Sequence, residues 1–212
     1  MHVLLMLTWL AAPLAPLNPI EQDTFPPAAL HAAIGGAIGN GIVSAGPIIA
    51  IQYEQLAIHP IVVRGGVELR AGSAKMRIWP DGDTGSSAVI DGNCESMALG
   101  VDCFCYRGTR RLTAYIGIGL LYSFSHFNAN SSSIAPARAE WGIDDLSVQQ
   151  QFGYRLLLGL RFRKNYSFEI EVTELRPDVQ FSGRLSPTRY FTGSNQTRLS
   201  TFSLSLGRSW TL

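Results

Sequence analysis

The sequence lacks any long uninterrupted apolar run beyond its N-terminus, and charged residues make up only 16% of its 212 residues. A membrane-spanning helix needs about 20 consecutive apolar residues, so a helical membrane protein is excluded. The formal net charge is only +1. No Lys/Arg-rich run with interleaved aromatic residues occurs, so no nucleic-acid partner is expected.

Motifs that carry chemistry are equally scarce. The three cysteines, Cys94, Cys103 and Cys105, form an odd set that leaves at least one thiol unpaired. The segment 81–85 begins like a calcium loop, but Gly92 stands where the closing bidentate glutamate is needed. No zinc framework, Walker A motif or dinucleotide fingerprint is present. The sequence therefore predicts no cofactor, no metal site and no catalytic residue.

The sequence does contain a regular alternation of apolar and small polar residues, clearest at the C-terminus. There Phe202, Leu204, Leu206 and Trp210 alternate with small polar residues and glycine. A period of two predicts a β-strand. The same alternation recurs in the segments 31–39, 47–54, 61–70, 97–106, 111–124, 150–162 and 165–175. Together with 202–210, these segments make eight predicted strands.

The connections between these strands fall into two classes. The turns near 56–60, 107–110 and 163–164 are short, whereas the links at about 72–95, 125–148 and 176–196 are long and rich in Gly, Ser, Asn and Asp. Short and long links alternate along the chain. The link at 40–46 is the exception, because it is short although it lies at the same end of the strands as the long links. This asymmetry is typical of outer-membrane barrels, which have short periplasmic turns and longer extracellular loops. We therefore expect an all-β, eight-stranded antiparallel up-and-down transmembrane β-barrel with both termini in the periplasm.

The cost of exposing charge to lipid predicts which face of each strand points inward. An arginine at mid-bilayer costs about 2–4 kcal/mol, so the charged face should line the lumen. This places five acids and five bases inside a narrow barrel, where they can pair. The predicted luminal ion network comprises Glu54, Glu68, Asp102, Glu169 and Glu171 with Arg64, Arg70, Arg111, Arg155 and Arg161.

The opposite face carries aromatic residues near both ends of the strands, as the interfacial girdles of membrane barrels do. The predicted periplasmic girdle comprises Tyr53, Phe162, Tyr166, Phe168 and Trp210. The predicted outer girdle comprises Tyr122, Phe124, Phe152, Tyr154 and Phe202. Arg208 interrupts the apolar face close to the C-terminus, where it can reach the interface.

The N-terminal 17 residues, MHVLLMLTWLAAPLAPL, have the apolar core and the small residues of a secretory signal. We expect residues 1–22 to form a signal-like segment with a Pro-rich lead-in, and cleavage near Ala12 or Ala15. Residues 30–212 are then the barrel domain.

The chain resembles the eight-stranded outer-membrane β-barrel families that include the OmpA transmembrane domain, OmpX and OmpW. The resemblance rests on the alternation, the loop asymmetry, the second strand GPIIAIQYE and the aromatic C-terminal strand. It implies a location in the bacterial outer membrane, contact with outer-membrane lipid and lipopolysaccharide, and insertion by the barrel assembly machinery through the C-terminal strand. Members of these families serve as anchors, adhesins, conduits or enzymes.

The function that these features favour is a structural or surface-interaction role, with a closed, charge-paired lumen and outward-facing loops that could bind an extracellular partner. A conduit for small hydrophobic molecules, as the OmpW resemblance implies, is an alternative because Leu121, Leu157 and Leu175 fall on the luminal face.

A second alternative is a lipid A deacylase-like enzyme, suggested by His126 near a barrel strand end. Asn128, however, stands where that chemistry needs a serine nucleophile, so we expect no enzyme. A third alternative, for the fold, is a soluble calycin-like barrel, which would require the apolar face of the strands to point inward and the charged face to lie in water.

Overall fold

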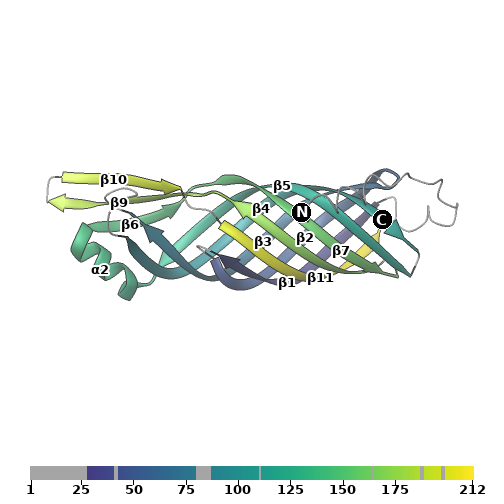
Figure 1. Ribbon diagram of the computed structural model, residues 1–212, viewed down its shortest axis with the longest axis horizontal. Helices are drawn as coiled ribbons and strands as arrows, with labels where there is room; N and C mark the ends of the chain where they lie inside the picture. Colours follow the sequence, from purple (N-terminus) through teal and green to yellow (C-terminus); the bar gives the residue numbers. More distant parts are fainter. Residues whose placement is uncertain are drawn as a thin grey trace, which may run out of the picture.

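The fold is a closed antiparallel barrel that carries a smaller sheet and one helix at one end (Figure 1). The computed structural model describes residues 28–40, 43–79, 87–109, 111–163, 165–186, 189–196 and 199–212. The signal-like segment 1–22 and the segment 81–85 lie outside the described residues. In the part of the chain that is described, no helix has the length and apolar character needed to cross a membrane.

Eight strands form the barrel, each hydrogen-bonded to two neighbours. They are β1 (Ala28–Asn40), β2 (Val43–Ile58), β3 (Ile61–Ile78), β4 (Ala88–Gly108), β5 (Leu112–Ala129), β7 (Gln151–Phe162), β8 (Tyr166–Leu175) and β11 (Leu199–Thr211). The ring closes where β1 pairs with both β2 and β11, so that Ile34 lies opposite Ile49 on one side and Leu206 on the other. Closure removes the free sheet edges that lipid could not solvate.

The apolar face of the strands points outward, as the cost argument predicted. Leu120 is 69% exposed and Phe152 is 79% exposed, whereas Asp102 and Arg64 on the opposite face are 1% exposed or less. The prediction of an eight-stranded transmembrane barrel is thus confirmed. A calycin-like arrangement, with the apolar face inside, is excluded by the same exposures.

The short connections lie at one end of the barrel, here called the turn end. They join β2 to β3, β4 to β5 and β7 to β8. The first described residue and the C-terminus meet at this end, where the Leu212 amide donates to the Ala28 carbonyl at 3.2 Å. The turn between β7 and β8 begins at Arg163, which has a positive φ of 50°.

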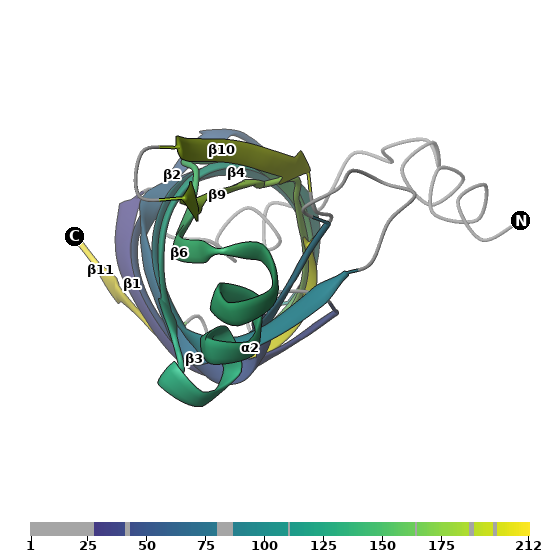
Figure 2. The ribbon, with the colours of Figure 1, turned by 90° about the vertical axis from the view of Figure 1, so that its left-hand side faces the viewer.

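The other end, here called the extension, is more ordered than the predicted long loops. Strands β3, β4 and β5 continue well past the barrel, and beyond them lie α2 (Ser131–Trp141), β6 (Ile143–Val148), β9 (Asp178–Ser186) and β10 (Arg189–Gln196). The sheet β10-β9-β6 and the helix lie over the barrel mouth (Figure 2). The prediction of loops was therefore wrong for the described parts of these links, since residues 72–78, 88–95, 125–129, 131–141, 143–148, 178–186 and 189–196 lie in strands or in the helix. Their polar residues occupy the outer faces of strands whose inner faces are apolar.

The described residues of the interior form two hydrophobic clusters. The extension cluster consists of Ala74, Met76, Ile78, Ala88, Ile90, Cys94, Ala98, Leu121, Phe127, Ile134, Ala137, Ile143, Leu146, Val148, Leu175, Val179 and Phe181. The turn cluster consists of Val62, Phe104, Tyr106, Tyr115 and Leu157. Buried charged side chains fill much of the remaining lumen. The inside of the barrel is therefore a packed core.

A barrel with a complete ring of hydrogen bonds resists unfolding by detergent. We expect the chain extracted from membranes to migrate differently on a denaturing gel before and after boiling, because sodium dodecyl sulfate alone does not open the closed sheet. A sample boiled beforehand serves as the unfolded control. Identical migration of both samples, with extraction of the chain by salt alone, would contradict the architecture.

Candidate functional site

The centre of the lumen is organised around Asp102 on β4. Its carboxylate accepts a hydrogen bond from Arg64 Nε at 3.0 Å, and two more from Arg155 Nε and Nη2 at 2.5 and 2.7 Å. All three side chains are at most 3% exposed. A carboxylate held by two guanidinium groups is a strong, geometrically fixed arrangement. Asp102 therefore joins the two arginines into one cluster.

Each of these arginines also binds a second carboxylate. Arg64 Nη1 donates to Glu169 Oε1 at 2.7 Å. Arg155 Nη1 donates to Glu68 Oε2 at 3.0 Å and to Glu171 Oε2 at 3.3 Å. The cluster thus extends from β3 and β4 across the lumen to β8.

Two further arginines complete the network at its margins. Arg70 pairs with Glu68 and donates to Glu171 Oε1 at 2.7 Å. Near the turn end, Arg161 Nη2 lies 2.7 Å from both carboxylate oxygens of Glu54. The structure therefore brings nine of the ten predicted luminal residues together inside the barrel.

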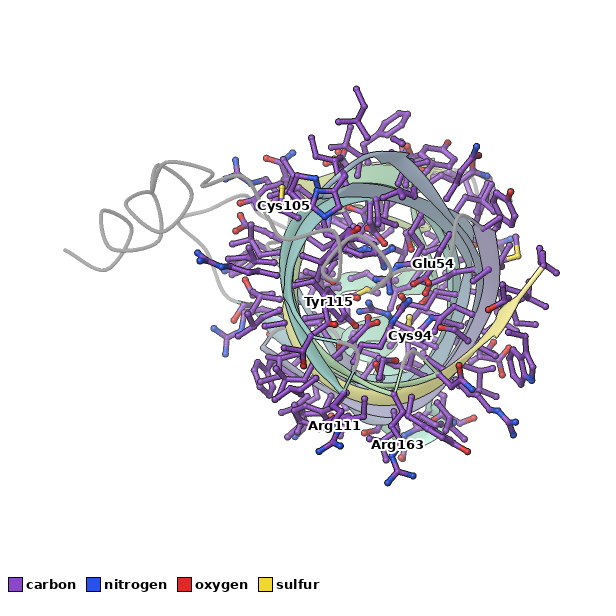
Figure 3. All side chains as sticks on the ribbon, turned by 90° about the vertical axis from the view of Figure 1, so that its right-hand side faces the viewer. Glu54, Cys94, Cys105, Arg111, Tyr115 and Arg163 are labelled. Atoms are coloured by element: carbon purple, nitrogen blue, oxygen red, sulfur yellow. The ribbon has the colours of Figure 1, made fainter. Side chains whose placement is uncertain are left out.

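The tenth residue, Arg111, does not belong to the network, so its assignment was wrong. It precedes β5 and is exposed. Figure 3 shows its side chain directed away from the barrel axis at the turn end. The alternation places Arg111 on the inward phase only if the strand includes it. The chain has already left the sheet there, because the regular ladder starts with Leu112 opposite Phe162.

Two network members were missed from the sequence. Tyr115 donates from its hydroxyl to Glu169 Oε1 at 2.5 Å. His31 is fully buried, with Nδ1 3.0 Å from Gln52 Oε1 and Nε2 2.8 Å from Ser167 Oγ. These contacts suit a neutral imidazole that carries its proton on Nδ1. Both residues lie on the same phase as the predicted charges, and that phase was the available signal.

The aromatic residues predicted for the girdles all lie on the outer face of the barrel. Those of the first set lie towards the turn end and those of the second towards the extension. In the second set, the Tyr122 ring contacts Phe124 and Phe152 at centroid distances of 4.9 and 4.7 Å. In the first set, the Arg208 guanidinium lies 5.7 Å from the Tyr166 ring and 5.4 Å from the Trp210 ring. Arg208 is thus accommodated on the apolar face by cation–π contacts.

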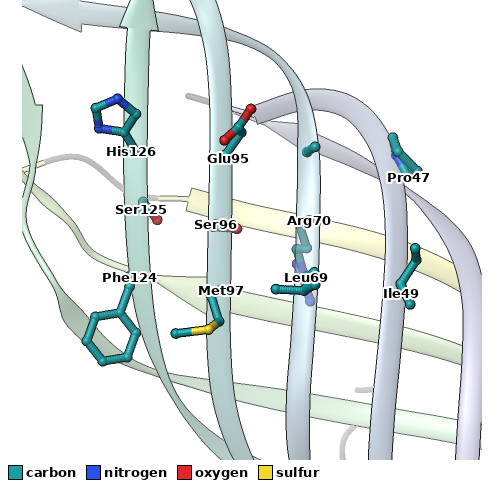
Figure 4. Close-up of a pocket in the computed structure, with 11 residues that line it drawn as sticks. Pro47, Ile49, Leu69, Arg70, Glu95, Ser96, Met97, Phe124, Ser125 and His126 are labelled. Carbon is teal, nitrogen blue, oxygen red and sulfur yellow. The ribbon is translucent and has the colours of Figure 1, made fainter.

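A groove of about 510 Å³ lies on the outer wall near the extension (Figure 4). Ile49, Leu69, Met97 and Phe124 contribute apolar side chains from four adjacent strands. His126 and Glu95, directly opposite each other on β5 and β4, line its far part. The groove therefore lies on the outer wall, and Arg70 of the luminal network is among the residues that line it.

The cysteines form no disulfide, since all three are free thiols. Cys94 is buried in the extension cluster, and Cys103 is exposed on the outer wall. Among the described residues, no group of three or more His, Cys, Asp or Glu side chains is arranged to hold a metal ion.

Removing one partner from the luminal network should destabilise the barrel. We expect Arg155→Leu to lower the free energy of unfolding by about 3–5 kcal/mol, because it leaves Asp102 and Glu171 without a major cation in a buried site. Urea titration of the band that shifts on heating measures this effect. Arg176→Leu is the matched control, because that arginine is 64% exposed. Equal stability of the two variants would show that the network contributes little.

Comparison with known proteins gives the context of this geometry. No family model and no curated protein sequence matches the chain. Among solved structures, the outer membrane protein OprG from Pseudomonas aeruginosa is similar with a TM-score of 0.56 and 13% identity, over 91% of this chain and 100% of that one. AlkL, solved by solid-state NMR in lipid bilayers, gives a TM-score of 0.50 and 12% identity, over 94% and 98%. The chain therefore has the fold of the eight-stranded outer-membrane β-barrels.

Proposed function

We propose that this chain is an integral outer-membrane barrel with a closed, charge-paired lumen, and that it serves a structural or surface-interaction role through its extension. The packed interior is the observation that carries this proposal. The Asp102 cluster spans the lumen, the extension cluster fills one end, and the turn cluster with the Glu54–Arg161 pair fills the other. The interior of an eight-stranded barrel is narrow enough for side chains to fill it.

The outer surface supports the membrane location. Every barrel strand exposes leucine, isoleucine or valine side chains on its outer face, and the aromatic girdles occupy other positions of the same face. In water such a surface would be strongly unfavourable, whereas lipid solvates it. The partners expected at this surface are outer-membrane lipid and lipopolysaccharide.

The two ends of the barrel support an orientation. Outer-membrane barrels place short turns in the periplasm and their larger connections outside. By this rule the turn end and both termini face the periplasm, and the extension projects from the cell. The C-terminal strand β11, which closes the ring against β1, is then positioned to present its aromatic residues to the barrel assembly machinery.

The extension supports an interaction role. The solvent face of its small sheet carries Asp145, Ser147, Gln180, Ser182 and Thr192 around a shallow concavity of about 560 Å³. Phe181 on the opposite face packs into the extension cluster and holds the sheet in place. A polar surface on a packed support is suited to binding an extracellular partner.

The interior argues against a conduit for hydrophobic molecules. Leu121 and Leu175 belong to the extension cluster, and both are paired with Gly153 on the neighbouring strand β7. Leu157 belongs to the turn cluster, and Arg155 lies between Gly153 and Leu157 on the inner face of β7. The luminal leucines thus form no continuous apolar path.

The proposed role includes no catalysis. His126 and Asn128 are both exposed, whereas the intervening Phe127 is buried in the extension cluster. The neighbouring Ser125 lies on the same inward phase as Ser123, so its hydroxyl is across the wall from the His126 ring. A changed acyl pattern of lipid A in cells that express the chain would contradict this part of the proposal.

A packed lumen should not conduct ions. We expect the purified chain, inserted in a planar bilayer, to show no more ion current than a protein-free bilayer, because charged side chains and two hydrophobic clusters block the path. An open porin in the same bilayer is the positive control. Reproducible single-channel steps, or faster entry of a small hydrophobic solute into vesicles, would favour the conduit instead.

The orientation makes a separate prediction. We expect a membrane-impermeant maleimide to label Ser182→Cys on intact cells, because that position lies on the solvent face of the extension. Thr109→Cys in the β4–β5 turn should react only after the outer membrane is permeabilised. The wild-type chain measures the background from its own three thiols. The reverse pattern would show that the turn end faces outward.

A further inference from the structure

The two ends of the barrel differ in the sign of their exposed charge. In the described ranges, the exposed side-chain carboxylates all belong to the extension end: Glu95, Glu140, Asp144, Asp145 and Asp178. Cations such as Lys75 and Arg138 lie among them and form ion pairs with Asp91 and Asp144. The extension therefore has a mixed surface.

Among the described residues of the turn end, the exposed side-chain charges are all positive, and the carboxylate of the chain end at Leu212 lies at the same end. Arg107, Arg111, Arg163 and Arg208 are all exposed there, and no salt bridge to any of the four is present in the described part of the chain. The nearest acid of the network, Glu54, is buried and already held by Arg161. We call these four residues the arginine collar.

A backbone hydrogen bond holds two residues of the arginine collar next to each other. The Arg163 amide donates to the Arg111 carbonyl at 3.1 Å, so two adjacent turns hold these like charges side by side. Figure 3 shows both side chains pointing away from the barrel axis, and neither enters the lumen. Like charges held together are unfavourable unless an anion is nearby.

The depth of the collar is defined by its neighbours in the chain. Arg111 precedes Leu112 and Arg163 follows Phe162, and both of these neighbours are exposed on the apolar wall. Arg208 lies directly opposite Tyr166 and contacts its ring. The guanidinium groups therefore lie where the apolar belt ends, at the level of lipid headgroups.

We propose that the arginine collar binds the phosphates of anionic phospholipids in the inner leaflet of the outer membrane. This inference rests on the proposed orientation, in which the turn end faces the periplasm. Guanidinium groups bind phosphate oxygens through paired N–H donors, and they are more weakly hydrated than ammonium groups. The collar would fix the depth of the barrel on the periplasmic side, while the mixed charge of the extension leaves the outer side free for other partners.

Native mass spectrometry of the full chain, folded in a neutral detergent, tests the proposal. Phosphatidylglycerol and phosphatidylcholine with identical acyl chains are the probes. We expect the wild-type chain to retain phosphatidylglycerol at least about fivefold more than phosphatidylcholine, since each arginine at an anionic surface contributes measurably. The preference should fall as salt is raised, because the collar is exposed.

Two matched variants locate the effect. R107Q/R111Q/R163Q should lose most of the preference for phosphatidylglycerol, whereas R77Q/R138Q/R176Q, which removes three exposed arginines from the extension end, should keep it. Equal retention of the two lipids by the wild-type chain, or an equal loss in both variants, would overturn the proposal. So would retention of lipopolysaccharide in place of phosphatidylglycerol through the collar.

The migration shift on heating separates this inference from the proposed function. If a variant keeps the shift, its barrel is folded, and a change in lipid retention then concerns the collar alone. If the wild-type chain shows no shift, the membrane barrel itself is wrong. If Thr109→Cys is labelled on intact cells, the barrel is kept but its orientation, and with it the choice of leaflet, is rejected.

Discussion

The pairing of charge inside the lumen is the constraint on which the rest of the structure depends. A guanidinium group such as that of Arg155 could not face lipid without a large penalty, and inside a narrow barrel it could not remain unpaired. The apolar face of every strand must therefore point outward, and the sheet must close around the charges. The direction of each side chain, the closure of the ring and the packed lumen all follow from this single requirement.

Small residues make the pairing geometrically feasible. Asp102 on β4 and Arg155 on β7 both lie opposite Gly119 on the intervening strand β5. A side chain at Gly119 would collide with them, so its absence lets Arg155 reach across β5 to Asp102. Gly159 likewise lies between Tyr115 and Glu169, whose side chains meet above it. The glycines on the inner face are thus the counterpart of the long charged residues.

Neutral donors compensate for the missing fifth arginine. Without Arg111, the lumen holds five carboxylates and four guanidinium groups. The Tyr115 hydroxyl donates to Glu169, and the Thr173 hydroxyl donates to Glu171 at 2.6 Å. A hydrogen bond from a hydroxyl group stabilises a buried carboxylate, and it adds no charge that itself needs a partner. This is why the network tolerates an excess of acids.

The sequence was sufficient for the barrel but not for the whole extension or the full network. Period-two alternation is long and regular in strands such as β7, so their faces could be assigned. Among the described side chains of β9, the large apolar residues of the inner face are Val179 and Phe181, and the polar residues around them resemble a loop. The inner face of β1 otherwise carries alanine and glycine, so the phase placed His31 inside, but its partners on β2 and β8 come from the structure.

The extension has a physical consequence for the barrel beneath it. Met76 and Ile90 are fully buried although they lie on parts of β3 and β4 that project past the barrel ring. An isolated two-stranded ribbon is only marginally stable in water, and here the helix, β6 and β9 supply the missing apolar cover. The same cover closes one mouth of the lumen over Leu121 and Leu175, away from bulk water. Sealing the charged network and supporting an outward-facing polar sheet are therefore two results of one packed cluster.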